Sequence, residues 1–156
     1  MRSAVVTVSD GVTAGTREDT SGQLLSSLLQ GAGYTVVDHV VVPDEREQIS
    51  DVLQNLAGTA ALIVTTGGTG LGPRDVTPEA TMAIIDRTMP GLSQLMLMKG
   101  LESTPMAALS RGVVGAKGST LIVNLPGSPR AVQEGWDALS PVLSHALALL
   151  AGDTSH

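Results

Sequence analysis

The sequence predicts an α/β fold built around a parallel sheet. Apolar stretches of strand length alternate with segments whose apolar residues recur at helical spacing, in the order strand, helix, strand, helix, strand. This order implies parallel strands joined by right-handed crossovers. A glycine-rich loop after the third strand supports the same fold, because open α/β sheets bind ligands beyond the carboxyl ends of their strands.

The first half of the chain carries the regular part of this pattern. The expected strands are 4–8, 34–42 and 60–64, and the expected helices are 20–29 and one from Asp44 or Glu45 to Gly58. The helical segments are recognised by leucines, isoleucine and valine at helical spacing, and each is ended by glycine. The segment 11–20 is small and polar, and it is expected to be a mobile loop.

The second half is less regular. The expected elements are helices over 78–87 and 91–102 and strands over 113–114 and 120–123, around a turn at 116–118. Ser128 and Pro129 are typical of a helix N-cap and a first helical position. Proline interrupts helical hydrogen bonding, so Ser140 and Pro141 are expected to start a separate last helix over 141–150. The chain shows neither repeat nor linker, so one domain over residues 1–156 is expected.

The composition excludes several classes of protein. The chain has no cysteine and three scattered histidines, too few for a thiolate site, a zinc site or a Ser-His-Asp triad. A formal net charge of −6 does not suggest a basic face for nucleic acid. No apolar stretch is long enough to span a membrane, and strand-like residues begin too soon after Met1 to leave room for a signal peptide. A cytoplasmic protein is therefore expected.

The few cations are placed unevenly. Arg74, Arg111, Lys117 and Arg130 all fall in or beside segments rich in glycine and proline. In an acidic protein, cations that gather in loops indicate a local anion site, although the ordinary exposure of loops could also place them there. The set as a whole favours the anion site.

The segment 65–81 offers the parts of a nucleotide site. Its glycines lie between a strand and a helix start, where backbone N–H groups can approach a phosphate closely. Thr77 is expected to be the N-cap of that helix, with Pro78 at its first position. Arg74 can bind a phosphate through two donors, and Asp75 can hold Mg²⁺ through carboxylate oxygens.

A tight packing loop, a P-loop and a dinucleotide fingerprint each fit this segment less well. A tight packing loop would explain a lone glycine pair, but it would not explain why Arg74 and Asp75 lie in the same loop. The string lacks the Lys-Ser/Thr pair of a P-loop, and it follows the third strand rather than the first, which argues against a dinucleotide fingerprint.

Four segments follow expected strands and could meet at one edge of the sheet. They are 9–20, 43–44, 66–77 and 124–128. Taken alone, Asp44 is best interpreted as a helix N-cap, and Ser110 with Arg111 could equally bind an anion or not. The methionines of the second half are expected in the core or in an interface rather than around a cofactor.

The strings TTGGTG at 65–70 and PRDVTPEAT at 73–81 resemble the molybdopterin adenylyltransferase family, which includes the bacterial MogA and MoaB proteins and the G domain of gephyrin. The resemblance extends along almost the whole chain. The further matches are Ser9-Asp10 with Gly15 and Asp19, Pro43-Asp44-Glu45, Met89-Pro90-Gly91, ALSR at 108–111 and NLPGSP at 124–129. The related MoeA and CinA families have a looser glycine motif and longer chains.

The resemblance implies a three-layer α/β sandwich with a mostly parallel central sheet, and it implies that the protein is a homotrimer. It also implies the reaction that the protein catalyses. In that reaction ATP adenylylates molybdopterin and releases pyrophosphate, with Mg²⁺ as the metal. The terminal phosphate of molybdopterin is already anionic, so its attack on the α-phosphorus needs no general base, and catalysis consists of positioning and charge neutralisation. A hand-over of product to a molybdenum-insertion protein is a further expectation.

The resemblance also assigns roles to residues. Asp44 and Asp75 match the family's catalytic, metal-associated aspartates. The residues expected to bind the nucleotide are Thr66, Gly67, Gly68, Thr69, Gly70, Arg74, Asn124, Pro126 and Gly127. Those expected to bind molybdopterin are Ser9, Asp10, Ser110 and Arg111. The chain has Gly11-Val12-Thr13 where many members carry a basic residue, which leaves the contacts of that loop open.

The alternative is a non-catalytic molybdopterin-binding or scaffold protein of the MoaB type. The two hypotheses differ in whether the metal-associated aspartates are needed. Because both Asp44 and Asp75 are present, the sequence favours the enzyme.

Overall fold

The computed structural model describes residues 1–155 and contains one six-stranded sheet in the order β2-β1-β3-β6-β5-β4. The strands are β1 (Arg2–Val8), β2 (Thr35–Val42), β3 (Leu62–Thr66), β4 (Arg87–Thr88), β5 (Val114–Lys117) and β6 (Thr120–Leu125). The first four in that order pair in parallel, whereas β5 pairs antiparallel with both β6 and β4. The prediction of a mostly parallel sheet is therefore confirmed.

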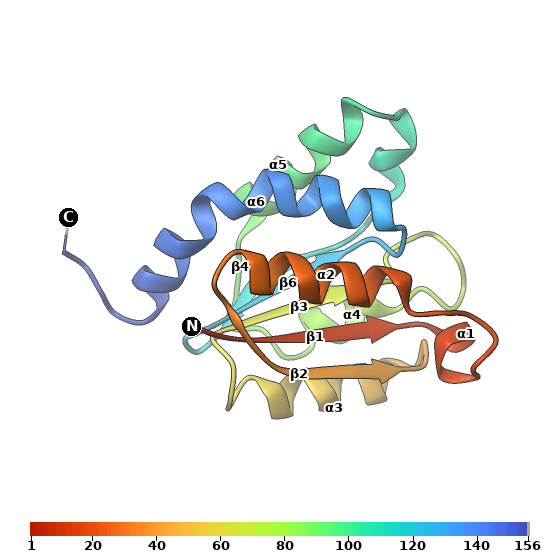
Figure 1. Ribbon diagram of the computed structural model, residues 1–156, viewed down its shortest axis with the longest axis horizontal. Coiled ribbons are helices and arrows are strands. Elements are labelled where there is room, and N and C mark those ends of the chain that lie inside the picture. The colour runs from red at the N-terminus through yellow and green to blue at the C-terminus, as the bar shows by residue number, and fades with distance from the viewer. Residues whose placement is uncertain (156) are drawn as a thin grey trace.

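Helices cover both faces of this sheet, which gives three layers (Figure 1). They are α1 (Asp10–Thr13), α2 (Thr20–Gly31), α3 (Arg46–Leu56), α4 (Thr77–Met82), α5 (Pro90–Leu101), the 3₁₀ helix η1 (Pro105–Leu109) and α6 (Pro129–Leu150). Helices α2, α5 and α6 pack on one face, and α3 and α4 pack on the other. Each fully buried strand therefore sends alternate side chains into two separate apolar cores.

The carboxyl ends of the parallel strands meet at one edge, as predicted. The backbone N–H of Ser9 after β1 donates to the carbonyl of Val42 at 2.9 Å. The N–H of Gly67 after β3 donates to the carbonyl of Leu125 at 3.1 Å. The hydroxyl of Thr66 donates to the carbonyl of Pro126 at 2.8 Å, so the loop after β6 is fixed to the glycine loop. These bonds bring distant parts of the chain to one place.

The expected mobile loop after β1 is partly helical. Residues Asp10–Thr13 form the short helix α1, whose N-cap Ser9 accepts a hydrogen bond from the N–H of Val12. Asp19 then caps α2 by accepting the N–H of Gly22 at 2.9 Å. Residues 14–19 are non-helical, as expected, and the prediction was wrong for residues 11–13, where the Ser9 cap supplies a local hydrogen bond that starts a helical turn.

The helix expected over 78–87 is shorter than predicted. Helix α4 ends at Met82, and residues 87–88 instead form the edge strand β4. The N–H of Asp86 donates to the carbonyl of Ala116, and that of Met89 donates to the carbonyl of Val114, both at 2.7 Å. Backbone pairing with β5 thus replaces the helical hydrogen bonds expected up to residue 87. This pairing depends on residues far away in the sequence.

The break expected at Ser140 is absent. Helix α6 runs without interruption through Pro141, and Figure 1 shows it changing direction in its second half. Leu139, Leu143 and Leu147 are all buried and continue one apolar stripe across the proline. Packing of this stripe compensates for the missing hydrogen bond, so proline bends the helix rather than ending it. Among the described helices, none has the length and apolar character needed to cross a membrane.

Candidate functional site

Gly67 and Gly68 shape the loop that follows β3. Both have positive φ, 99° and 67°. A Cβ on Gly67 would lie 2.2 Å from the carbonyl oxygen of Val8, so the loop passes directly over the end of β1. Only glycine combines this φ with this close approach. These two glycines therefore have a packing function, whatever ligand the loop binds.

Thr77 closes the same loop from its far side. Its hydroxyl donates to the carbonyl of Gly67 at 3.0 Å, and its N–H donates to the carbonyl of Gly68 at 3.1 Å. The N-cap of α4 is Val76, which makes no side-chain cap bond, and Thr77 is already the first helical residue. The prediction that Thr77 is the N-cap was wrong by one position, because its hydroxyl serves the loop instead.

Asp10 and Asp44 bind each other's backbone. The N–H of Asp10 donates to Oδ2 of Asp44 at 2.9 Å, and the N–H of Asp44 donates to Oδ1 of Asp10 at 3.0 Å. Asp44 is therefore not the helix N-cap that its position suggested. Burial, with a contribution from the charges of Asp10 and Asp75, raises the pKa of Asp44 above its usual range. The three carboxylates thus form one electrostatic group.

Arg74 pairs with Asp10 of this group and with Glu45 beside it. Its Nε donates to Oδ2 of Asp10 at 3.0 Å, and its NH2 group donates to Oε1 of Glu45 at 2.9 Å. The hydrogen bonds from Arg74 hold the pKa of Asp10 below its usual range. The Arg74 side chain is 54% exposed, so it can exchange these partners for a phosphate without uncovering the core.

Arg111 braces the glycine loop. Its Nε donates to the carbonyl of Gly70 at 2.9 Å, and its NH2 group donates to the carbonyl of Asp75 at 2.8 Å. Its NH1 group forms an ion pair with Glu79, which lowers the pKa of that carboxyl. Because all three nitrogens have protein partners, Arg111 acts here as a support for the segment that carries Asp75.

Asn124 is a buried cross-link between the sheet and α4. Its amide donates to the hydroxyls of Thr65 and Thr81 at 3.1 and 3.0 Å, and its oxygen accepts the N–H of Val113 at 3.2 Å. Its side chain is fully buried. Asn124 therefore fixes the floor of the site.

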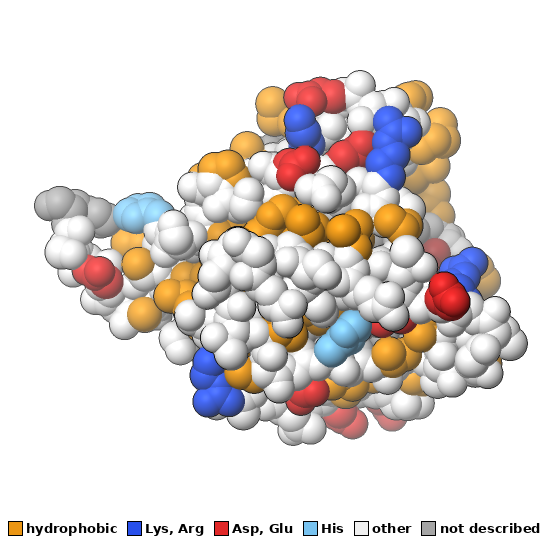
Figure 2. Space-filling view, viewed as in Figure 1, with side chains coloured by type: hydrophobic (Ala, Val, Ile, Leu, Met, Phe, Trp, Pro, Cys, Tyr) orange, Lys and Arg blue, Asp and Glu red, His pale blue; other side chains and the backbone are white. Residues whose placement is uncertain are grey.

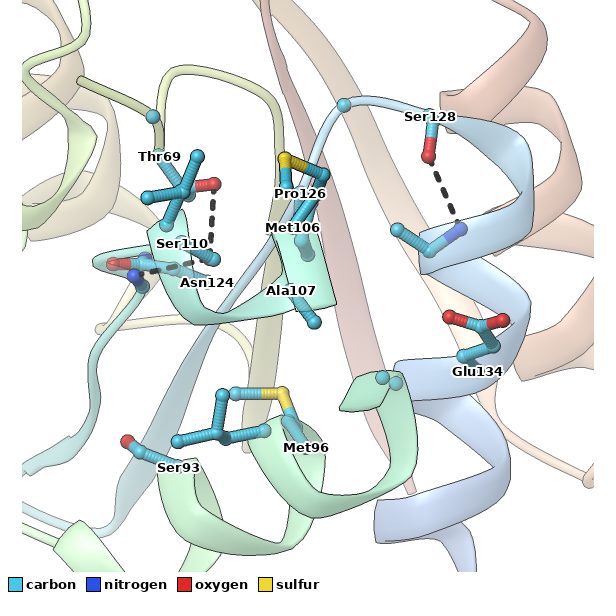
Figure 3. A pocket seen from close by; sticks show the side chains of 18 of the residues that line it. Thr69, Ser93, Met96, Met106, Ala107, Ser110, Asn124, Pro126, Ser128 and Glu134 are labelled. Carbon is cyan, nitrogen blue, oxygen red and sulfur yellow. Dashed lines mark hydrogen bonds between the residues drawn. The ribbon is translucent and has the colours of Figure 1, made fainter. Parts of the chain in front are cut away.

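A cavity of about 630 Å³ opens beside the glycine loop, between α5, η1 and the start of α6 (Figure 3). The predicted residues that line it are Gly68, Thr69, Gly70, Asp75, Ser110, Asn124, Pro126 and Gly127. The hydroxyl of Ser110 donates to that of Thr69 at 3.3 Å, which joins the two loops on one side of the cavity. One space thus contains residues expected on both the nucleotide side and the molybdopterin side.

The remaining predicted residues do not line this cavity. They are Ser9, Asp10, Asp44, Thr66, Gly67, Arg74 and Arg111. The sequence interpretation missed much of the wall, including Ser93, Gln94, Met96, Met106 and Glu134. The methionines were expected in the core or in an interface rather than around a cofactor, but Met96 of α5 and Met106 of η1 line the cavity.

The four predicted cations do not form a common anion site. Lys117 is the last residue of β5, at the opposite edge of the sheet, where its Nζ lies 3.6 Å from Oδ1 of Asp86. Arg74, Arg111 and Arg130 each pair with a carboxylate. Within residues 1–155, none of the four lines the cavity. The lining of the cavity therefore supplies no cation to a phosphate.

Arg74→Ala is expected to reduce kcat/KM for ATP about tenfold while the melting temperature changes by less than about 3 °C. The exposed guanidinium has few packing partners, so its loss affects the ligand more than the fold. Steady-state kinetics and thermal unfolding measure the two effects. Lys117→Ala removes a cation from the opposite edge and serves as the control. A large fall in melting temperature with unchanged kinetics contradicts the prediction.

Comparison with known proteins places this chain in a family. The model of a probable molybdopterin binding domain matches residues 4–145. The crystal structure of the molybdopterin biosynthesis enzyme MoaB from Thermus thermophilus superposes with a TM-score of 0.91 and 50% identity, over 97% of this chain and 96% of that one.

Relatives by sequence agree. The chain is 42% identical to the molybdenum cofactor synthesis protein cinnamon of Drosophila melanogaster over 97% of its own length and 26% of that protein. It also spans 49% and 47% of two bacterial molybdenum cofactor biosynthesis bifunctional proteins. It is 35% identical to the molybdopterin adenylyltransferase of Helicobacter pylori over 96% of this chain and 87% of the relative. The chain belongs to the molybdopterin-binding domain family of molybdenum cofactor biosynthesis.

Proposed function

We propose that the protein is a molybdopterin adenylyltransferase. In the proposed reaction, a terminal phosphate oxygen of molybdopterin attacks the α-phosphorus of ATP. A new P–O bond forms, the bond between the α- and β-phosphates breaks, and pyrophosphate leaves. The meeting of Asp75 and the glycine loop in one cavity, on a chain of this family, carries the proposal.

The chemistry needs positioning more than proton transfer. The attacking oxygen is already an anion, so no residue must remove a proton from it. Backbone N–H groups of a glycine loop can bind phosphate oxygens without a side-chain cation. Arg111 and Asn124 hold the loop and the floor in place, which reduces the reorganisation required when the substrates bind.

Magnesium fits the carboxylates at this site. Mg²⁺ in nucleotide enzymes is usually held by one or two carboxylates together with phosphate oxygens and water. Asp75 lines the cavity, and its charge is close enough to Asp44 to raise the pKa of that carboxyl. No cluster of three potential ligands occurs in the described part of the chain, so substrate phosphates complete the proposed coordination. The ion supplies neutralisation of the charge that develops on the phosphates.

The direct test mixes protein, molybdopterin, ATP and Mg²⁺ and measures adenylylated molybdopterin and pyrophosphate. We expect both products in equal amounts and neither when Mg²⁺ is chelated. Binding of molybdopterin without any product supports the alternative, a scaffold protein of the MoaB type. Delivery of the product to a molybdenum-insertion protein, and a cytoplasmic location, are parts of the same proposal.

We also propose that the protein is a homotrimer. Helix α5 and η1 leave Leu97, Met98, Leu101, Met106 and Leu109 between 39% and 65% exposed, an apolar face that a subunit interface can cover. Light scattering at micromolar concentration is expected to give about three times the chain mass of 15.9 kDa. A monomer at that concentration rules the trimer out.

A further inference from the structure

Glu134 introduces a second negative charge into the cavity. Among the described residues that line it, Asp75 and Glu134 are the only ionisable ones. Figure 3 shows Glu134 across the cavity from Thr69 and Ser110, with Met96, Met106 and Ala107 between them. The carboxylate lies in the second turn of α6, and its side chain is only 17% exposed. A charge held this far from solvent requires compensating partners.

Two neighbours fix one oxygen of this carboxylate. Ser103 donates its hydroxyl to Oε1, and Arg130 donates Nε to the same atom at 3.1 Å. The hydrogen bond from Ser103 and then that from Arg130 hold the pKa of Glu134 below its usual range, so the group is ionised at neutral pH. Figure 2 shows this surface of α5 and α6 as a mixture of acidic and basic side chains. Oε2 takes part in neither of these bonds and is not among the fully buried unpartnered oxygens of residues 1–155, and the side chain that carries it lines the cavity.

The side chains at the Glu134 end of the cavity indicate which part of a ligand can bind there. An ionised carboxylate repels phosphate, so the phosphates belong at the glycine loop. The free oxygen can only accept hydrogen bonds, and the surrounding methionines suit a flat, polarisable ring. We propose that Oε2 of Glu134 accepts a hydrogen bond from the exocyclic amino group of a substrate heterocycle. This inference rests on the proposed function, because both ATP and molybdopterin carry such an amine.

This contact makes Glu134 a specificity residue. A buried site that is built to accept a hydrogen bond discriminates strongly against an analogue that offers none. ITP differs from ATP in carrying a carbonyl oxygen in place of the amino group. If the ring at Glu134 is adenine, the carboxylate faces an acceptor in ITP, and the wild-type protein is expected to bind ATP about tenfold more tightly than ITP.

Glu134→Gln gives a sharp test because its orientation is fixed. Ser103 and Arg130 both donate to the position of Oε1, so they keep the amide oxygen there and turn the NH₂ group toward the cavity. The variant therefore presents a donor where the wild type presents an acceptor. Calorimetry is expected to show that the ATP-to-ITP affinity ratio falls at least about tenfold. Asp137→Asn, an exposed change one turn further along α6, is the matched control.

The outcomes separate the two substrates. A reduced ATP-to-ITP ratio assigns the contact to adenine. An unchanged ratio with a tenfold loss of affinity for molybdopterin assigns it to the pterin, and also supports the proposal. Unchanged affinities for ATP, ITP and molybdopterin in Glu134→Gln overturn it. If the wild-type protein binds neither ATP nor molybdopterin, the proposed function itself fails, which is a different result from the loss of selectivity.

Discussion

Asp75→Asn is expected to lower kcat about a hundredfold or more while the affinity for molybdopterin changes little. Oδ2 of Asp75 accepts the N–H of Gly72 at 2.9 Å, a bond that the amide oxygen of asparagine can also accept. The loop can therefore keep its shape while the charge disappears. Mg²⁺ is then held poorly, and the charge that develops on the phosphates is less neutralised.

The measurement is adenylylation rate against Mg²⁺ concentration, together with molybdopterin affinity by calorimetry. Asp86→Asn is the control, because Asp86 accepts the N–H of Gly118 at 2.7 Å in a similar way but lies at the opposite edge of the sheet. Wild-type turnover by Asp75→Asn at every Mg²⁺ concentration removes this carboxylate from the mechanism and returns the scaffold hypothesis to consideration.

Gly67→Ala is expected to reduce the free energy of unfolding by at least about 3 kcal/mol. Two effects combine at this position, a φ of 99° and a Cβ that would lie 2.2 Å from the carbonyl oxygen of Val8. Relieving that contact requires the loop to move away from β1, and this movement also displaces the site.

Gly33→Ala separates the two effects. Gly33 has a φ of 88°, but a Cβ there meets no atom within 4 Å. The Gly33→Ala variant has the backbone strain without the steric contact, so its free energy of unfolding is expected to fall by about 1 kcal/mol. Urea unfolding of both variants gives the comparison. Equal losses of stability would show that the approach to Val8 is unimportant.

The fold could be predicted further than the site. The order of strands and helices and the meeting of strand ends follow from local patterns, because each buried strand and each amphipathic helix shows its own periodicity. The edge strand β4 could not be found this way, since two residues have no periodicity and their pairing with β5 depends on distant atoms. Pro141 was misjudged for a related reason, because the packing that preserves the helix is tertiary.

Some site residues could be identified from local sequence, and others could not. Gly67, Gly68 and Asp75 were visible as a motif, since their positions after a strand limit what they can do. The roles of Arg111 and Glu134 depend on which atoms face them. A cation in a loop looks like an anion ligand in the sequence, but the acceptors around Arg111 are carbonyls and a carboxylate.

The junction of the strand ends has a consequence for how ligands affect unfolding. The hydroxyl of Ser21 bonds the carbonyl of Gly127, a partner 106 positions away, and Asp10 bonds Asp44 across 34 positions. The binding surface therefore requires segments far apart in the chain to be assembled, and we expect partially unfolded forms to have little affinity for substrate. By mass action, ATP at a hundred times its dissociation constant adds about 2.7 kcal/mol to global stability. Amide hydrogens deep in β1 and β6, far from any ligand contact, should exchange more slowly to the same extent.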